Sequence, residues 1–209
     1  MINLEGINLE GIKNIFFDLG GVLVNLDREK CLNEFQKIGV RKVEEQIENS
    51  FTRGLFRQLE VGTITPEEFR NEIRQMTDKQ VTDSEIDYAW NSFLLYIPCS
   101  KLELLLRLRK NYRVFMLSNT NKIHFDYMVS NHFKAKPGFS IDDYFEKCYL
   151  SYELHLSKPD KAIFEAIIKD SGALPQESLF LDDNRQNVEA ARELGIRSLL
   201  VGEDGFGFE

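Results

Sequence analysis

Polar side chains that can do chemistry follow three of the apolar segments of this sequence. Asp18 follows "NIFF", Ser118 and Asn119 follow "VFML", and Asp182 and Asp183 follow "SLFL". Each of them alone is equally well explained as a turn residue or a helix cap, where Asp, Ser and Asn are favoured. Carboxylates gathered from two segments repel each other unless a cation lies between them, and hard oxygen ligands suit Mg²⁺. The combination therefore indicates a metal-dependent site.

Lys158, in "LSKPD", is a further candidate. Pro159 is expected to open the following helix, which would place Lys158 at the N-terminal edge of that helix. The positive end of the helix dipole disfavours a cation there, so an anion should offset the cost. A lysine beside a helix N-terminus can hold a phosphate or a carboxylate, and the alternative is a solvated lysine next to a cap.

Apolar runs and helical segments alternate along much of the chain. The runs are continuous, as in buried parallel strands, and lie at residues 14–17, 113–117, 178–181 and 198–201. Segments with helical spacing lie at residues 101–110, 160–170 and 187–194. This alternation indicates right-handed βαβ units. We therefore expect an α/β fold, a doubly wound parallel sheet of Rossmann-like type, with the polar residues at the carboxyl ends of its strands, where ligands bind.

The segment between the first two strands has a different pattern. Residues 27–97 contain no convincing strand but several amphipathic helical stretches, which are too long together for a simple crossover. One of them begins at Thr65, with Pro66 at the first helical position and Glu68 placed for a capping box. We predict an α/β core domain of residues 1–26 and 98–209 and an inserted α-helical cap subdomain of residues 27–97.

Composition narrows the class of protein. The 209 residues include 26 basic and 34 acidic side chains, with a net charge of −8 and no basic block, so nucleic-acid binding is not expected. No stretch approaches the ~18 apolar residues of a membrane span, and no signal peptide is indicated. The three cysteines are far apart, form no CxxC pair and fit core positions in a reducing compartment. We expect a cytoplasmic protein without a membrane partner; the sequence indicates no oligomeric state.

The chain resembles the haloacid dehalogenase (HAD) superfamily, which consists mostly of phosphatases. The resemblance rests on "FFDLGGVLV", "FMLSNTN", "LSKPD" and "LFLDDNRQNVEAA", in this order, and covers nearly the whole chain. The segment "GLFRQLEVGTITPEEF" resembles the family's helical cap. The branch most similar in character is that of small sugar-phosphate phosphatases resembling α-D-glucose-1-phosphatase, whose first motif also reads DLG. The resemblance implies a Mg²⁺-dependent phosphoric monoester hydrolase acting on a small phosphorylated metabolite such as a sugar phosphate.

The resemblance also implies which residues would hold the metal and react. Asp18 would be the nucleophile, attacking phosphorus to give an aspartyl-phosphate. Mg²⁺ would lie between Asp18, Asp183 and the backbone carbonyl of Gly20, with Asp182 beside or among the ligands.

Four residues would bind the phosphate or support that binding. The hydroxyl of Ser118 and the backbone amide of Asn119 would hold the transferring phosphoryl oxygens. Lys158 would supply positive charge to Asp18 and the phosphate. Asn187 would orient Lys158 or the metal shell.

Gly20 departs from the family pattern, since most of these phosphatases have a second Asp there. That residue protonates the leaving alcohol and then activates water, help that is typically worth ~10²–10⁴ in rate. One interpretation is a working phosphatase that uses another acid, water or an easier leaving group, such as the anomeric oxygen of a sugar 1-phosphate. A second is a dehalogenase, which needs neither this acid nor the metal that Asp182 and Asp183 suggest. A third is a non-catalytic binding or regulatory protein with this fold.

Substrate contacts are less clearly marked in the sequence. His155 stands where relatives usually have Gly; it is either a surface histidine or, if it faces the cleft, a proton donor near neutral pH. Further candidates share only a charge or an amide near the first motif or in the cap: Asn25, Asp27, Arg28, Arg53 and Arg57. The inserted helices can close over the cleft and exclude water.

Overall fold

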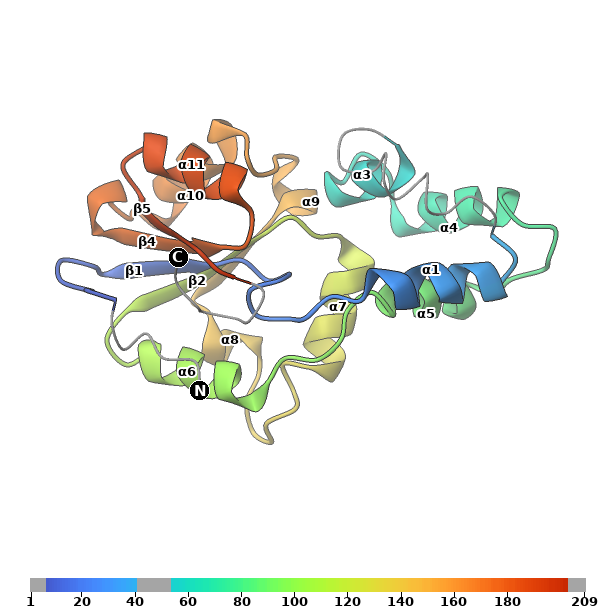
Figure 1. The fold of residues 1–209 in the computed structure, drawn as a ribbon, viewed down its shortest axis with the longest axis horizontal. Helices are drawn as coiled ribbons and strands as arrows, with labels where there is room; N and C mark the ends of the chain where they lie inside the picture. Colours follow the sequence, from blue (N-terminus) through green and yellow to red (C-terminus); the bar gives the residue numbers. More distant parts are fainter. Residues whose placement is uncertain (1–6, 41–53, 203–209) are drawn as a thin grey trace.

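The computed structural model describes residues 7–40 and 54–202, which contain a five-stranded parallel sheet in the order β3-β2-β1-β4-β5 (Figure 1). The strands are β1 (Asn14–Phe17), β2 (Arg113–Ser118), β3 (Lys147–Leu150), β4 (Ser178–Asp182) and β5 (Arg197–Leu200). All four pairings are parallel. The predicted doubly wound α/β fold is therefore confirmed.

Four of the strands were expected from the sequence, and β3 was not. Among the strands of the described residues, β3 lies at the edge of the sheet and pairs with β2 alone. Its sequence, "KCYL", begins with an exposed lysine and becomes buried only at Tyr149 and Leu150. Two buried residues are too short an apolar run to indicate a strand by periodicity.

Helices cover both faces of the sheet. The helices of the sheet domain are α6 (Cys99–Leu108), α7 (Lys122–Asn131), α8 (Ile141–Tyr144), α9 (Ser151–Leu154), α10 (Lys161–Ser171) and α11 (Arg185–Glu193). A 3₁₀ turn, Pro175–Glu177, precedes β4. Figure 1 shows α10 and α11 on one face of the sheet and α6 and α8 on the other. This three-layer arrangement explains the continuous apolar runs, because each strand is buried on both sides.

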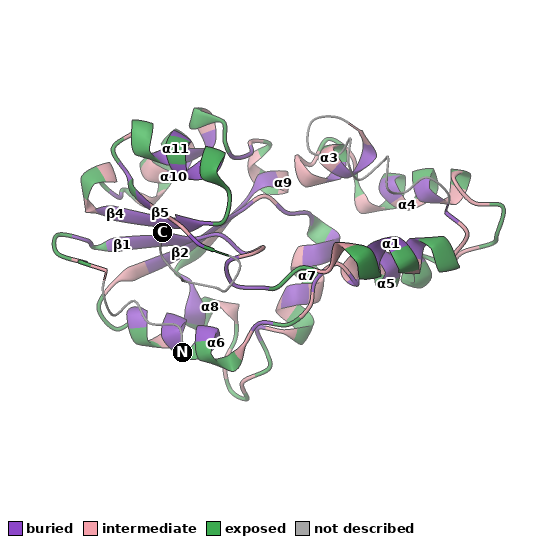
Figure 2. Ribbon diagram, viewed as in Figure 1, coloured by how far each residue is buried: buried purple, intermediate pink, exposed green. Residues whose placement is uncertain are grey.

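Successive residues of β1 contact opposite layers. Ile15 and Phe17 pack in a cluster with Leu105 of α6, whereas Phe16 packs with Phe164 of α10. All three β1 residues are at most 1 % exposed. Figure 2 shows the buried strands between helices whose outer faces are exposed. The sheet is thus a rigid base for the residues that follow its strands.

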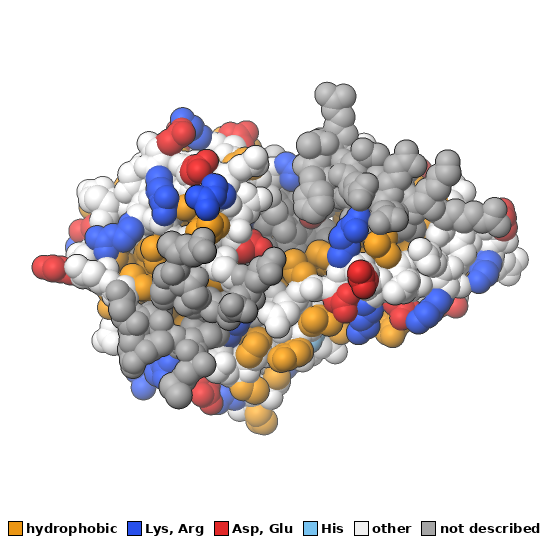
Figure 3. All heavy atoms as spheres, viewed as in Figure 1, with side chains coloured by type: hydrophobic (Ala, Val, Ile, Leu, Met, Phe, Trp, Pro, Cys, Tyr) orange, Lys and Arg blue, Asp and Glu red, His pale blue; other side chains and the backbone are white. Residues whose placement is uncertain are grey.

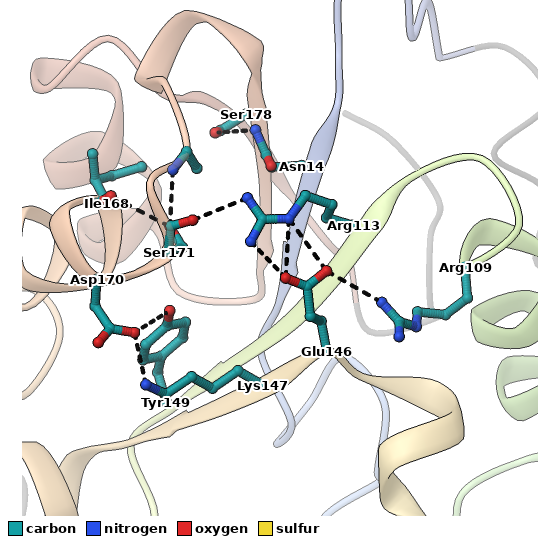
Figure 4. Close-up of polar contacts among 11 residues, drawn as sticks. Asn14, Arg109, Arg113, Glu146, Lys147, Tyr149, Ile168, Asp170, Ser171 and Ser178 are labelled. Atoms are coloured by element: carbon teal, nitrogen blue, oxygen red, sulfur yellow. Dashed lines mark hydrogen bonds and ion pairs between the residues drawn. The ribbon is translucent and has the colours of Figure 1, made fainter.

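A polar network ties the amino ends of the strands together (Figure 4). The guanidinium of Arg113 donates to Glu146 and to the carbonyl of Ser171, and Lys147 donates to Asp170 at 2.7 Å. These residues link β2 and β3 to α10 at the edge opposite Asp18, which follows the carboxyl end of β1. The network therefore connects the layers and lies away from the candidate site.

Within the described residues, four further helices form a helical unit beside the sheet, on the right in Figure 1. They are α1 (Arg28–Lys37), α3 (Leu55–Glu60), α4 (Pro66–Gln75) and α5 (Asp83–Asn91). The unit has its own apolar cluster, centred on Phe35, Phe56, Phe69 and Trp90, to which α7 adds Ile123. A separate cluster fits the predicted division at residues 26/27 and 97/98, which stays a prediction.

Two linkers join the helical unit to the sheet domain and lie antiparallel to each other. Leu26 pairs with Leu94, and the amides of Asp27 and Leu95 donate to the carbonyls of Phe93 and Asn25. Within the unit, the predicted capping box of Thr65 and Glu68 is present. The same motif caps α5.

None of the helices in the described ranges is long and apolar enough to cross a membrane. Basic and acidic side chains are interspersed on the coloured part of the face shown in Figure 3. Cys31 is buried and Cys148 half-buried, but Cys99 is exposed at the start of α6, so the expected core position is wrong for Cys99.

His124 connects α7 to the helical unit and is expected to make the protein acid-sensitive. It is 5 % exposed, its ring stacks on that of Trp90 at 4.2 Å, and its Nε2 donates to the Trp90 carbonyl. Burial lowers the pKa of His124 from 6.5 to about 4, partly opposed by this hydrogen bond. As the pH falls from 6.5 towards 4, His124 binds a proton in the unfolded chain but not in the folded protein. The free energy of unfolding should therefore fall by about 3 kcal/mol over this range. Urea unfolding of wild type and His124→Phe at pH 7 and pH 4.5 measures this; an equally steep loss in the variant would contradict the assignment.

Candidate functional site

Asp18 directly follows β1 at the carboxyl edge of the sheet. It is 8 % exposed, and its Oδ1 accepts from the backbone amide of Leu19 at 2.7 Å and from Lys158 Nζ at 2.8 Å. Burial raises the pKa of Asp18 to about 8; Lys158 opposes this shift and Asp182 adds to it. The carboxylate is thus poorly hydrated, and nearby cations must stabilise its charged form.

The ammonium of Lys158 has three acceptors. It donates to Asp18 Oδ1 at 2.8 Å, to Asp182 Oδ2 at 2.7 Å and to the carbonyl of Leu117 at 2.9 Å. Its side chain is 1 % exposed. Burial by itself would lower the pKa of Lys158, but the two carboxylates outweigh it and the net shift is upward. The ammonium therefore stays charged and is held in one position.

The predicted position of Lys158 at a helix N-terminus is wrong. α10 begins at Lys161, with Asp160 as its N-cap, so Pro159 does not open the helix. The bond between Lys158 and Pro159 is a cis peptide. The anions that the dipole argument required are present for another reason, since Asp18 and Asp182 bind the ammonium directly.

Asp182 ends β4 and is completely buried. Besides Lys158 at Oδ2, it accepts from the amide of Asn184 at 2.8 Å and from Asn187 Nδ2 at 2.9 Å, both at Oδ1. Both of its oxygens are therefore engaged with protein donors. Asn187, on α11, reaches Lys158 only through Asp182, which is consistent with the orienting role expected for it.

Asp183 completes a cluster of three carboxylates. One oxygen each of Asp18, Asp182 and Asp183 lies within 4.8 Å of the others. Burial, followed by the charge of Asp182, raises the pKa of Asp183. Three carboxylates and the single ammonium of Lys158 leave an excess of two negative charges, which a divalent cation with a preference for oxygen would balance. The residues present therefore fit Mg²⁺.

Gly21 makes room for Asp183. A Cβ atom at this position would lie 1.9 Å from Asp183 Oδ2, and the backbone has φ +69°. Only glycine allows both the left-handed conformation and the close approach of the carboxylate. The second glycine of "DLGGVLV" is thus explained by the cluster.

Replacing Gly21 by Ala is expected to weaken Mg²⁺ binding by about 10–100-fold, as is typical when the support of a ligand is disturbed. Titration calorimetry with Mg²⁺ measures the change without relying on turnover. Gly172→Ala is the matched control, because Gly172 has φ +65° but no atom within 4 Å of its Cβ position. Equal weakening in both variants would mean that backbone strain, and not the displacement of Asp183, is responsible.

The last residue of β2, Ser118, and the first residue of the following loop, Asn119, lie at this edge. Ser118 is 2 % exposed at the end of the strand. The Asn119 side chain donates to the Lys158 carbonyl and accepts from the Lys158 amide, both at 2.9 Å. This side-chain contact, absent from the sequence-based hypothesis, holds the backbone of Lys158 against the loop.

Residues of the helical unit reach the same edge. The hydroxyl of Ser151, directly after β3, lies 2.6 Å from the carbonyl of Glu60 and accepts from the amide of Thr120. Arg57 donates to Ser157, the neighbour of Lys158. Sequence reasoning did not select these two residues. Ser151 stands in no recognisable motif, and Glu60 is one of several acidic residues in the cap-like segment.

Other sequence candidates have structural contacts or lie outside the described residues. The Nδ1 of His155 donates to the carbonyl of Val61 at 3.0 Å, so its ring contacts the helical unit. Asp27 is the N-cap of α1 and accepts from the amide of Lys30. Arg28 follows it in α1, and Asn25 is exposed in the linker. Arg53 lies outside the described residues.

The chain is similar to proteins of one family. A family profile described as haloacid dehalogenase-like hydrolase matches residues 12–195. A D-ribitol-5-phosphate phosphatase of Bacteroides thetaiotaomicron is 38% identical over 187 residues, covering 90% of each protein. A structure of an HAD family enzyme from the same organism, in complex with magnesium and inorganic phosphate, has 49% identity, a TM-score of 0.88 and coverage of 92% of this chain and 95% of its own. A predicted HAD-like hydrolase of Porphyromonas gingivalis has 40% identity, a TM-score of 0.83 and 90% coverage of each chain.

The sheet, the carboxylate cluster and these similarities agree. The chain belongs to the haloacid dehalogenase-like hydrolases. The family resemblance inferred from the four motifs is thereby confirmed.

Proposed function

We propose that this chain hydrolyses the phosphate monoester of a small sugar or sugar alcohol through a phosphorylated Asp18. The observation that carries the proposal is the buried pair of Asp18 and Lys158, 2.8 Å apart beside the carboxylate cluster. A buried carboxylate held next to a fixed ammonium is suited to attack an anionic phosphorus centre, since the ammonium offsets the repulsion.

The predicted class is confirmed: the chain is a phosphatase of this family that uses Mg²⁺. The phosphatase relative acts on D-ribitol 5-phosphate, as its name states. Its 38% identity over most of both proteins supports a substrate of the same kind. We therefore extend to this chain the substrate class, a phosphorylated polyol or sugar, and not the individual compound.

In the first step, an oxygen of Asp18 forms a bond to phosphorus while the ester bond of the substrate breaks. Lys158, the hydroxyl of Ser118 and the backbone amide of Asn119 bind the phosphoryl oxygens as charge develops on them. Asn119 also keeps Lys158 in place through the two hydrogen bonds to its backbone. In the second step, water attacks the phosphoryl group, and Asp18 is released together with inorganic phosphate.

Asp18, Asp183 and the carbonyl of Gly20 would hold Mg²⁺, with Asp182 supporting them from the side of Lys158. When bound, the ion supplies positive charge for the carboxylates and the phosphoryl group. Asn187 would act on Lys158 indirectly, because its amide donates to Asp182 and holds that carboxylate in place.

The helical unit is proposed to act as the cap that selects the substrate. Its contacts with the edge of the sheet, through Glu60 and Arg57, support this assignment. Arg57 is then a candidate for contact with an anionic substrate.

A cytoplasmic location stays a prediction from the cysteine content. Fractionation of the source cells would test it.

The substrate panel that tests this function contains ribitol 5-phosphate, glucose 1-phosphate, glycerol 3-phosphate and p-nitrophenyl phosphate, each with Mg²⁺ and with EDTA. The proposal predicts Mg²⁺-dependent turnover of the aryl ester and preference for one of the polyol or sugar esters. A preference for glucose 1-phosphate would support the easier leaving group as the explanation of Gly20. No turnover of any ester would favour the non-catalytic binding protein, and release of halide from a 2-haloacid would favour the dehalogenase.

A further inference from the structure

Because this chain has Gly20 where most phosphatases of the family have Asp, the leaving oxygen of the substrate lacks its usual proton donor. A Cβ atom at Gly20 would lie 3.3 Å from Leu26 Cδ1. The space next to Gly20, where the side chain of an acid would start, is therefore lined by an apolar side chain. The alkoxide of an ordinary polyol is a poor leaving group and needs a proton as the ester bond breaks. Another acid at the edge of the sheet is therefore required if such an ester is the substrate.

We propose that Glu60 of α3 is this acid and gives its proton to the leaving oxygen of the substrate. The proposal rests on the proposed function and adds a catalytic residue from the helical unit. It follows from three observations: the position of the Glu60 backbone, the charges around its side chain, and the close contact between the end of α3 and residues 151–155 of the sheet domain.

The backbone of Glu60 is fixed on the sheet domain. Its carbonyl lies 2.6 Å from the hydroxyl of Ser151, which also bonds both backbone groups of Thr120, two residues after Ser118. The backbone of Glu60 is thus linked through one side chain, that of Ser151, to the loop that is proposed to bind the phosphoryl group. Figure 1 shows α3 next to α9, which begins at Ser151.

The turn that follows Glu60 packs closely against residues 152–155 of the sheet domain. A Cβ atom at Gly62 would lie 2.2 Å from the carbonyl of Tyr152, and Gly62 has φ +69°. The His155 ring contacts the carbonyl of Val61 on the other side of this turn. The end of α3 is therefore held at a defined distance from the sheet domain, as a proton donor must be.

The charges around Glu60 suit a group that exchanges a proton near neutral pH. Its side chain is 30% exposed and forms an ion pair of 3.7 Å with Arg57. Loss of hydration raises the pKa of Glu60 to about 7, opposed by Arg57 and by the ammonium of Lys158. Arg57 also donates to Ser157, the residue before Lys158, so the ion pair of Glu60 and Arg57 adjoins the segment that carries the ammonium. On the other side, α4 packs against α3 through Phe69, and α9 brings His155 to the neighbouring carbonyl.

The proton transfers balance over both steps. The carboxylic acid of Glu60 protonates the bridging oxygen as its bond to phosphorus breaks and the Asp18–phosphorus bond forms, so a neutral alcohol leaves. The resulting carboxylate then takes a proton from the water that attacks the phosphoryl group. Hydrolysis returns Asp18 as a carboxylate and Glu60 as an acid.

The test compares two esters in Glu60→Gln. The kcat/KM for ribitol 5-phosphate is expected to fall by about 10²–10⁴, because the alkoxide loses its proton donor. The kcat/KM for p-nitrophenyl phosphate should change by less than about threefold, because p-nitrophenolate needs no proton and kcat/KM includes only the steps up to its release. In the wild type, kcat/KM for the alkyl ester should decline as the pH rises past about 7, where Glu60 loses its proton, and this limb should vanish in the variant.

Glu67→Gln, an exposed position in the first turn of α4, removes a carboxylate from the same unit and should leave both esters unaffected. An equal loss on both esters in Glu60→Gln would assign Glu60 a structural role and overturn the proposal, as would retained activity on the alkyl ester. Failure of the wild type to hydrolyse even the aryl ester would instead contradict the proposed function.

Discussion

Replacing Asp18 by Asn is expected to reduce the hydrolysis of every phosphate ester by ~10⁴-fold or more, the scale of effect seen when an enzyme loses its nucleophile. An amide oxygen has the shape of the carboxylate but not the charge needed to attack phosphorus. Steady-state turnover of p-nitrophenyl phosphate is the most direct measurement, because its leaving group makes the reaction independent of an acid. Acid-quench trapping of a phosphorylated enzyme should succeed with the wild type and fail with the variant.

Stability separates this loss from misfolding. Burial disfavours the charged form of Asp18, so Asp18→Asn is expected to unfold at a urea concentration no lower than the metal-free wild type does. Asp126→Asn, at an exposed position on α7, is the control for the same change of side chain. Retention of substantial turnover by Asp18→Asn would rule out the phosphorylated Asp18.

Replacing Lys158 by Met is expected to damage both stability and catalysis. The methionine fits the volume but leaves the buried carboxylates of Asp18 and Asp182 without their ammonium. Breaking a buried ion pair in this way typically costs about 3–5 kcal/mol in the free energy of unfolding. We expect kcat/KM to fall by about 10²–10³, since an oriented positive charge is lost from the transition state. Urea unfolding and steady-state kinetics at pH 7.5 measure the two effects.

Two further variants identify the cause of the stability loss in Lys158→Met. Lys161→Met removes a lysine whose partner, Glu193, lies on the surface, and should leave the urea midpoint nearly unchanged. Lys158→Met combined with Asp182→Asn should recover part of the lost stability, because it removes one of the uncompensated charges. No recovery in the double variant would mean that packing, and not charge, explains the loss.

The sequence alone was sufficient for four of the five strands of the sheet and for several residues at its carboxyl edge. Continuous apolar runs occur where strands are buried on both faces, and parallel strands must bring their carboxyl ends to one edge, so Asp18, Ser118 and Asp182 could be expected to meet. β3 escaped prediction because an edge strand with two buried residues carries too weak a pattern. Pro159 was misassigned because its type suits a helix start, whereas the N-cap is Asp160.

Only the tertiary structure decided how the polar residues share their contacts. Residue type and spacing do not distinguish Asp182 from Asp183, and the family resemblance left open whether Asp182 is a ligand. In the structure the oxygens of Asp182 are taken by Lys158 and Asn187, whereas Gly21 allows Asp183 to approach the cluster. Glu60 is one of 34 acidic residues, and nothing in its local sequence separates it from the others. Its link to the loop after β2 depends on hydrogen bonds of Ser151 between segments far apart in the chain. Residue type and spacing determine which groups are available, but the surroundings that set their hydration and charge are assembled only when the helical unit packs on the sheet.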